Sequence, residues 1–301
     1  MLETVRRRVT ASATDPFGHA PYPLAHSLDH APDPGLFGPD SVSWRVIGDV
    51  SSFVGGIRAL LIQAAHPEVV AGVADHSRYR DDPLGRLSRT SSYVTATTFG
   101  AMPEVEAAIA VVRRAHTRVA GVSHRGVANR ADDPPFAAWV HNALTDSFLT
   151  AYRAYGPERL DEAEADRFVV EQAEIGRLLD ADPLPDTARS LARWVSAHPD
   201  IGPSPGLTET VTFLQDPPLS AGQRAGYRAL FVAAVAILPE RLRDVLGVRP
   251  AIGAEGIGRA TVGSLRWALG SSPSWRLALA RVGAPEPPGI FRQPLPVPPT
   301  D

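Results

Sequence analysis

The feature that most limits the fold of this chain is the spacing of its apolar residues. They recur at intervals of three and four, in segments that end at proline or glycine. Such spacing puts apolar side chains on one face of a helix. Alternating runs typical of strands are scarce, and no Asn-Gly or Asp-Gly pair marks a hairpin. The pattern predicts an all-α fold, with helices over about residues 49–65, 84–99, 103–119, 134–155, 161–179, 186–197, 220–246, 255–269 and 273–282.

The two ends of the chain lack this spacing. Residues 9–41 are rich in Pro, Gly, Asp and His, and residues 285–301 contain seven prolines. Segments of this kind favour irregular or extended backbone. We therefore expect an irregular N-terminal arm over residues 1–40, a single globular helical domain over residues 41–284, and a Pro-rich tail over residues 285–301.

The composition excludes several kinds of chemistry. The 301 residues include no cysteine, which rules out disulfides, thiolate nucleophiles, iron–sulfur clusters and a cysteine-bound haem. The net charge of -3 gives no basic footprint for nucleic acid. A metal in this chain would depend mainly on the nine histidines and on carboxylates.

Possible export signals and membrane spans indicate where in the cell the protein would be found. Arg6, Arg7 and Arg8 suggest a twin-arginine export signal, but no apolar run follows them. The most apolar stretch, residues 229–238, falls far short of the roughly 20 residues that a membrane span needs. We expect a cytoplasmic protein without a transmembrane segment. The sequence does not indicate the oligomeric state.

One histidine lies on the apolar face of the expected helix 103–119. The stripe that contains it predicts that His116 points into the core; its members are Val105, Ala108, Ile109, Val112, His116 and Val119. A buried histidine usually has a structural role with satisfied nitrogens. An imidazole on an apolar helix face is also how several helical proteins present the proximal ligand of haem iron.

Polar residues one turn apart mark the expected helix 84–99. Arg86 and Thr90 share a face, and Arg89 lies beside them. The simpler interpretation is a solvated face on which arginine stems cover apolar surface. The alternative is a polar patch in a pocket, where these side chains donate hydrogen bonds to iron-bound oxygen or to haem propionates.

Three further histidines are weaker candidates. His141 lies at the edge of an apolar stripe in the expected helix 134–155, which makes it a second possible axial ligand. His66 and His76 are ten residues apart, a separation that matches no standard zinc motif. For these two we expect a structural or supporting role.

Several segments together point to one family. They are Trp44-Arg45, Gly48-Asp49, the run GGIRALLIQAAHPEVVAGVADHSRYRDDPLGRLSRTSSYV from Gly55, HTRVAG from His116, ADDPPFAAWVHNALTDSFL from Ala131 and ILPERLRDVLGV from Ile237. Over about residues 40–250 the chain resembles the family that contains rubber oxygenase (latex-clearing protein) and the mycophenolic-acid pathway oxygenase.

The resemblance implies a somewhat globin-like helical core with one b-type haem. It places the proximal histidine at His116 and the distal arginine and threonine at Arg86 and Thr90. Rubber oxygenases have a lysine just before that threonine, where this chain has Arg89, and arginine is a very poor iron ligand.

The expected function is that of a haem b-dependent oxygenase. Its substrate would be a small apolar molecule, alkene or terpenoid-like, cleaved oxidatively or hydroxylated with dioxygen or peroxide. A haem or apolar-ligand binding protein without turnover, acting as a carrier or sensor, is the alternative. A helical interaction protein with no cofactor is the third possibility.

Overall fold

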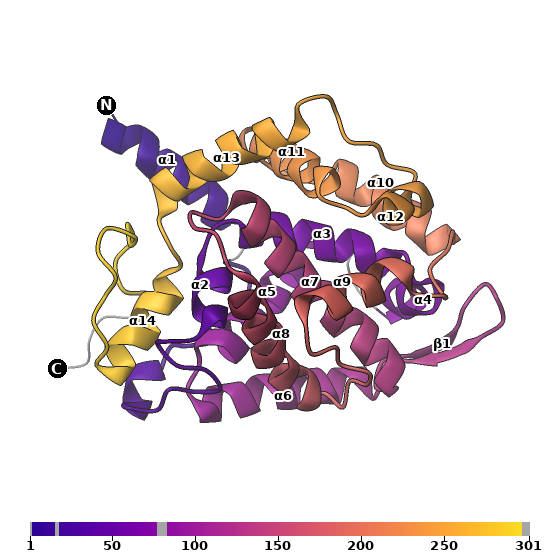
Figure 1. Cartoon of the computed structure of the whole chain (residues 1–301), viewed down its shortest axis with the longest axis horizontal. Coiled ribbons are helices and arrows are strands. Elements are labelled where there is room, and N and C mark those ends of the chain that lie inside the picture. The colour runs from indigo at the N-terminus through magenta and orange to yellow at the C-terminus, as the bar shows by residue number, and fades with distance from the viewer. Residues whose placement is uncertain (1, 16–17, 77–82, 297–301) are drawn as a thin grey trace. The chain divides into compact units, whose positions relative to one another are not determined.

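The computed structural model describes residues 2–15, 18–76 and 83–296, and over these residues the chain is overwhelmingly helical (Figure 1). The prediction of an all-α fold is therefore confirmed. Eight of the expected helices form close to their expected limits: α3 (Ser52–Ala64), α5 (Pro83–Phe99), α6 (Met102–His116), α7 (Pro134–Tyr155), α8 (Glu162–Arg177), α9 (Ala188–Ala197), α13 (Ala254–Leu269) and α14 (Pro273–Val282).

The expected helix over residues 220–246 is instead two helices, α11 (Ala221–Ala236) and α12 (Glu240–Leu246). Pro239 separates them and stands at the N-cap of α12. A proline ring clashes with the preceding turn and lacks an amide proton, so a helix cannot continue through this position undisturbed.

Five helical elements of the described residues were not predicted: α1 (Leu2–Thr14), the 3-10 helix η2 (Ser27–His30), α2 (Val42–Gly48), α4 (Pro67–His76) and α10 (Pro205–Gln215). The N-terminal segment is thus helical at its start and irregular only afterwards. The elements η2 and α2 are one or two turns long, too short to show a helical period.

The described residues include one short hairpin, which no Asn-Gly or Asp-Gly pair marks in the sequence. Strands β1 (Ala120–Val122) and β2 (Ala128–Arg130) pair in antiparallel fashion, with Gly121 opposite Asn129. The loop between them is longer than the two-residue turns that Asn-Gly would mark, and Gly126 supplies its positive φ of 75°.

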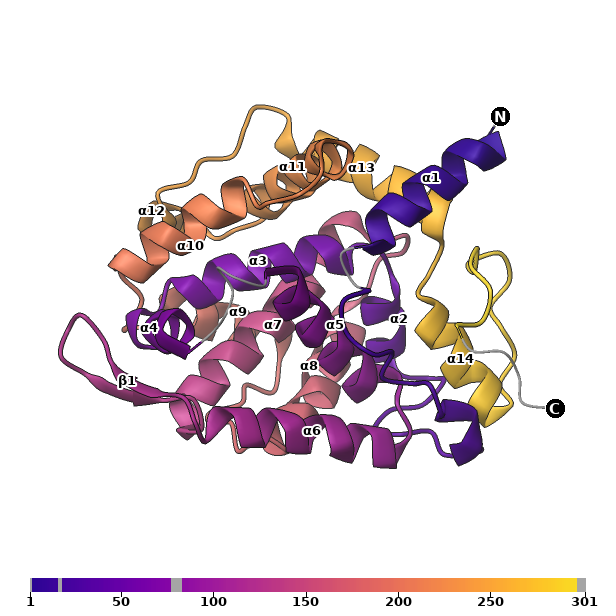
Figure 2. The ribbon, with the colours of Figure 1, turned by 180° about the vertical axis from the view of Figure 1, so that it is seen from behind.

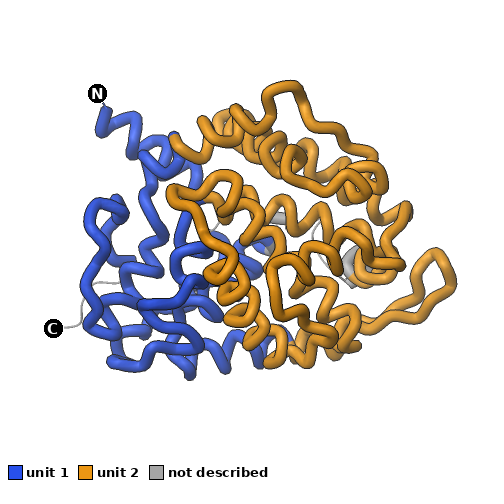
Figure 3. Tube along the Cα trace, in the orientation of Figure 1, with its two compact units in different colours: residues 1–50, 78–112, 264–301 blue, residues 51–77, 113–263 orange. Residues whose placement is uncertain are grey.

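The chain forms two compact units (Figure 3). Unit 1 contains residues 1–50, 78–112 and 264–301, and unit 2 contains residues 51–77 and 113–263. The boundaries at 112 and 263 fall inside α6 and α13, so neither unit is one continuous stretch of chain.

The core of unit 2 is built around α3. This helix packs against α7 on one side and against α10 and α11 on the other, as both views of the ribbon show (Figures 1 and 2). The close approach of α3 to α7 depends on Gly55, because a Cβ atom there would lie only 2.7 Å from Cδ1 of Phe148.

Unit 1 is organised around α14, which contacts η2, α2 and α5. Arg281 of α14 is buried and donates hydrogen bonds to the carbonyl oxygens of Asp33 and Phe99 and to Oγ of Ser27. The Pro-rich tail folds back on the same unit, where Phe291 lies edge-on against Trp275, with ring centroids 5.5 Å apart.

No single helix among the described residues is both long and apolar enough to cross a membrane. The pair α2 and α3 reaches that length and composition only when the two are counted together across a sharp bend.

Candidate functional site

His116 is the last residue of α6, and it is half-buried rather than a core residue as its stripe suggested. The stripe is fully buried only at Val105 and Ile109. Burial lowers the pKa of the His116 imidazole below its usual value, while the carboxylate of Asp132 acts in the opposite direction. At neutral pH this imidazole is therefore uncharged, which is the form that binds metals.

Asp132 is the charged neighbour of His116. It lies between β2 and α7, and Arg130 holds both of its oxygens, with Nε 3.0 Å from Oδ1 and Nη2 2.9 Å from Oδ2. This contact with Arg130 is the main reason why the pKa of Asp132 is lowered, and His116 adds to the effect. A charged carboxylate near an imidazole favours positive charge on the ring, and here burial outweighs that effect.

His141 lies in the interface between α7 and α8. A Cβ atom on Gly176 would lie 2.9 Å from Cδ2 of the ring, and Oγ1 of Thr145 is 3.4 Å from Nε2. Burial lowers the pKa of His141 to about 4, although a hydrogen bond with the backbone of Gln172 acts in the opposite direction. These contacts enclose the ring on several sides and favour a structural role.

The other predicted residues belong to α5. Arg89 and Thr90 are exposed in unit 1, and the side chain of Arg86 lies outside the described part of the structure. His116 and His141 belong to unit 2. The roles that the resemblance implies for Arg86, Arg89 and Thr90 stay predictions.

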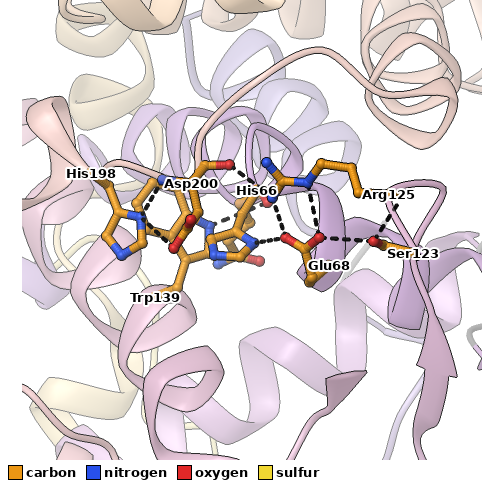
Figure 4. Close-up of polar contacts among 8 residues, drawn as sticks. His66, Glu68, Ser123, Arg125, Trp139, His198 and Asp200 are labelled. Atoms are coloured by element: carbon orange, nitrogen blue, oxygen red, sulfur yellow. Dashed lines mark hydrogen bonds and ion pairs between the residues drawn. The ribbon is translucent and has the colours of Figure 1, made fainter. Parts of the chain in front are cut away.

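Unit 2 also contains a cavity that we did not predict. Its volume is about 320 Å³, and it is lined by His66, Glu68, Arg125, Val127, Phe136 and Asp200. Figure 4 shows most of these side chains, which come from the α3–α4 junction, the hairpin loop and the segment after α9. Polar and aromatic groups thus meet in one place from parts of the chain far apart in sequence.

Glu68 is the buried acid of this cavity. Oε1 accepts hydrogen bonds from Oγ of Ser123 at 2.8 Å and from Nε of Arg125 at 3.0 Å, and Oε2 pairs with Nη2 of Arg125. Burial alone would raise the pKa of Glu68, but these hydrogen bonds outweigh it and lower the pKa to about 2. The carboxylate is charged and fully engaged with its partners.

His66 stands beside Glu68 in an aromatic wall. Its ring is buried, with centroid distances of 5.5 Å to Trp139, 5.6 Å to Phe136 and 5.4 Å to His198. Burial first, and the nearby His198 second, lower the pKa of His66 to about 4. The imidazole is neutral at pH 7, so its 3.3 Å approach to Glu68 is not an ion pair.

His198 and Asp200 lie in the segment that follows α9, and they approach His66 from there. His198 is the C-cap of α9, and Nδ1 of its ring lies 3.9 Å from Oδ2 of Asp200. The amide of Gly202 donates to the carbonyl oxygen of Ala65 at 2.9 Å, which ties this loop to the α3–α4 junction.

A sequence signal for this cluster does exist. His66-Pro67 and His198-Pro199 are both His-Pro pairs, and each follows the end of an expected helix. A residue before proline is biased towards extended backbone, so such a histidine projects from a helix end instead of continuing the helix. Local spacing relates His66 only to His76, and for this reason the prediction missed its partner 132 positions away.

Comparison with known proteins identifies a family. Residues 44–267 fit the family described as ER-bound oxygenase mpaB/B'/rubber oxygenase, catalytic domain. No curated protein and no solved structure matches the chain.

Proposed function

Because the chain belongs to the family of the mpaB/B' and rubber oxygenase catalytic domain, we propose that it is a haem b-dependent oxygenase in which His116 would bind the iron. The family match supports an oxygenase and, more broadly, an oxidoreductase that takes substrate and oxygen. The assignment of haem as the cofactor and of His116 as its ligand goes beyond the family match, and it rests on the surroundings of His116.

The position and charge of His116 carry this proposal. A haem ligand must be neutral and open to the cofactor. His116 is half-buried and uncharged at pH 7, and the Asp132 carboxylate beside it is held by Arg130. His141 is neutral as well, but α8 and Thr145 enclose its ring, so it is not open to a cofactor.

When bound, haem would supply the activation of oxygen, and the residues of the chain would supply its ligand, polarity and access. His116 would hold the iron, and the nearby carboxylate of Asp132 would favour positive charge at its imidazole. Arg86 and Thr90 would donate hydrogen bonds where negative charge develops on oxygen. Arg89 would remain a cation without binding the iron.

We propose a small apolar substrate, alkene or terpenoid-like, because one name within the family description is rubber oxygenase. The reaction would be oxidative cleavage or hydroxylation, with dioxygen or peroxide as the oxidant.

The first experiment is a visible spectrum of the full-length protein produced with ample haem precursor. We expect a Soret band that is lost or displaced in His116→Ala but kept in His124→Ala, which removes an exposed histidine of the hairpin loop. Circular dichroism would show that both variants are folded. A band unchanged in folded His116→Ala would overturn the ligand assignment, and no band in the parent would overturn the proposal of haem.

Turnover needs a second measurement, namely oxygen uptake in the presence of an alkene. Arg86→Ala should keep the Soret band but lower the rate by about 10² to 10³, as the loss of a preorganised donor does. A haem protein that shows no substrate-dependent oxygen uptake in either form would instead be a carrier or sensor.

A further inference from the structure

The cluster around His66 has a donor set typical of a metal site and separate from His116. His66, His198 and Asp200 each offer one ligand atom, and these three atoms lie within 4.8 Å of one another. Ligands bound at about 2.1 Å to a single ion would lie roughly 3 to 3.5 Å apart. The side chain of Asp200 is exposed and can rotate, so the three ligand atoms can move closer together when an ion binds.

His198 and Asp200 are close neighbours within the cluster. Nδ1 of His198 accepts a long hydrogen bond of 3.4 Å from the Asp200 amide and lies 3.9 Å from Oδ2 of the same residue. A ring nitrogen and a carboxylate oxygen therefore meet next to the ring of His66.

Glu68 lies against the buried ring of His66. The residue is only 3% exposed, and its Nδ1 lies 3.3 Å from Oε2 of Glu68 (Figure 4). With Nδ1 turned toward this carboxylate, Nε2 is the nitrogen that remains for a metal ion, and a carboxylate near the other ring nitrogen is a common arrangement for a metal-binding histidine.

Glu68 is a neighbour of this cluster rather than a fourth ligand. Its two oxygens are occupied by Ser123 and Arg125, and Arg125 also donates to the carbonyl oxygen of Asp200 at 3.2 Å (Figure 4). The guanidinium thus neutralises Glu68 and fixes the backbone that carries Asp200.

We propose that His66, His198 and Asp200 bind one divalent first-row transition-metal ion at the wall of the 320 Å³ cavity. Two imidazoles and one carboxylate suit Zn²⁺, Fe²⁺ or Co²⁺, and poorly suit Mg²⁺ and Ca²⁺, which prefer oxygen ligands. Since His66 and Asp200 also line the cavity, the coordination positions that the protein does not fill would open onto it.

Binding of Co²⁺ to the full-length chain tests this proposal, because Co²⁺ gives visible absorption that reports its ligands. The His116→Ala background, stripped with a chelator, keeps haem iron out of the measurement. We expect one Co²⁺ per chain, displaced by Zn²⁺, with affinity at least about tenfold lower in His198→Ala and in Asp200→Ala. Both residues are less buried than His66, so these variants should fold even where His66→Ala does not.

The matched control is His26→Ala. Nδ1 of His26 lies 3.5 Å from Oδ2 of Asp29 on the surface, a histidine–carboxylate pair outside the proposed site. Its removal should leave Co²⁺ binding unchanged. Equal Co²⁺ affinity in the parent, His198→Ala and Asp200→Ala would overturn the proposal, as would a loss of binding in His26→Ala alone.

Discussion

Nη1 of Arg58 lies 2.7 Å from Oδ2 of Asp146, and the two side chains are only 2% and 6% exposed. The same arginine donates to Oγ of Ser147 at 2.9 Å and, through Nε, to the carbonyl oxygen of Ile237 at 3.2 Å. It therefore joins α3 to α7 and to the end of α11 through polar contacts inside the core of unit 2.

Replacing Arg58 with methionine should destabilise the protein strongly. The change leaves the buried Asp146 carboxylate without its cation, and breaking such a pair costs about 3–5 kcal/mol. Denaturant unfolding followed by circular dichroism measures this loss. The double variant Arg58→Met/Asp146→Leu should recover most of the stability, because it removes the uncompensated charge. A single variant within about 1 kcal/mol of the parent would show that the pair is not what holds these helices together.

Two adjacent glycines of α3 should respond in opposite ways to alanine. At Gly55 a Cβ atom would lie 2.7 Å from Cδ1 and 3.1 Å from Cα of Phe148, so Gly55→Ala should cost about 1–3 kcal/mol by overpacking. At Gly56 no described neighbour lies within 4 Å of the same atom. Gly56→Ala should therefore stabilise the protein by up to about 1 kcal/mol through helix propensity. Thermal unfolding of both variants decides the matter, and equal effects would exclude the close α3–α7 contact.

The limits of the helices could be predicted where prolines and glycines mark them. The prediction for α7 is confirmed at both ends, because Pro134-Pro135 begins it and Gly156-Pro157 ends it. By contrast α4 begins directly after α3 with only two residues between them. Nothing in the apolar spacing indicates a second helix so close to the first.

The cluster around His66 could not be predicted, because it depends on tertiary contacts. Positions 198 and 200 lie beside position 66 in a loop that the hydrogen bond from Gly202 to Ala65 holds against the α3–α4 junction. His116 shows the reverse case, since its stripe predicted a core position and the helix ends there instead. Periodicity predicts the face of a helix, but it does not say which neighbours cover the last turn.

Within unit 1, the packing of residues 27–33 should depend on Arg281. Its guanidinium is fully buried and donates to Ser27, Asp33 and Phe99. Lysine cannot reproduce this planar set of donors, so Arg281→Lys should loosen residues 27–33 and expose them to protease. Limited proteolysis should cut this segment at least several times faster in the variant. Arg276→Lys, which changes a partly exposed arginine on the same helix, serves as the control and should leave the cleavage pattern unchanged.

The burial of His141 predicts that stability falls on acidification. Its pKa is about 4 in the folded protein, against an ordinary 6.5, because burial disfavours the imidazolium. Above pH 6.5 the ring is neutral in both states and its contribution is fully present. Between pH 6.5 and 4 the unfolded chain binds a proton that the folded chain does not, so the free energy of unfolding falls.

The difference between the two pKa values corresponds to about 3 kcal/mol over this interval. His141→Gln removes the proton binding, so between pH 7 and 4 the parent should lose about 3 kcal/mol more stability than the variant. Denaturant unfolding at several pH values measures how the free energy of unfolding changes with pH in the parent and in the variant. Contributions from other groups cancel in the comparison. His124→Gln changes an exposed histidine, and its free energy of unfolding should depend on pH as that of the parent does. A His141→Gln profile that is also parallel to the parent would contradict the burial of the ring, and His141 would then again be a candidate iron ligand beside His116.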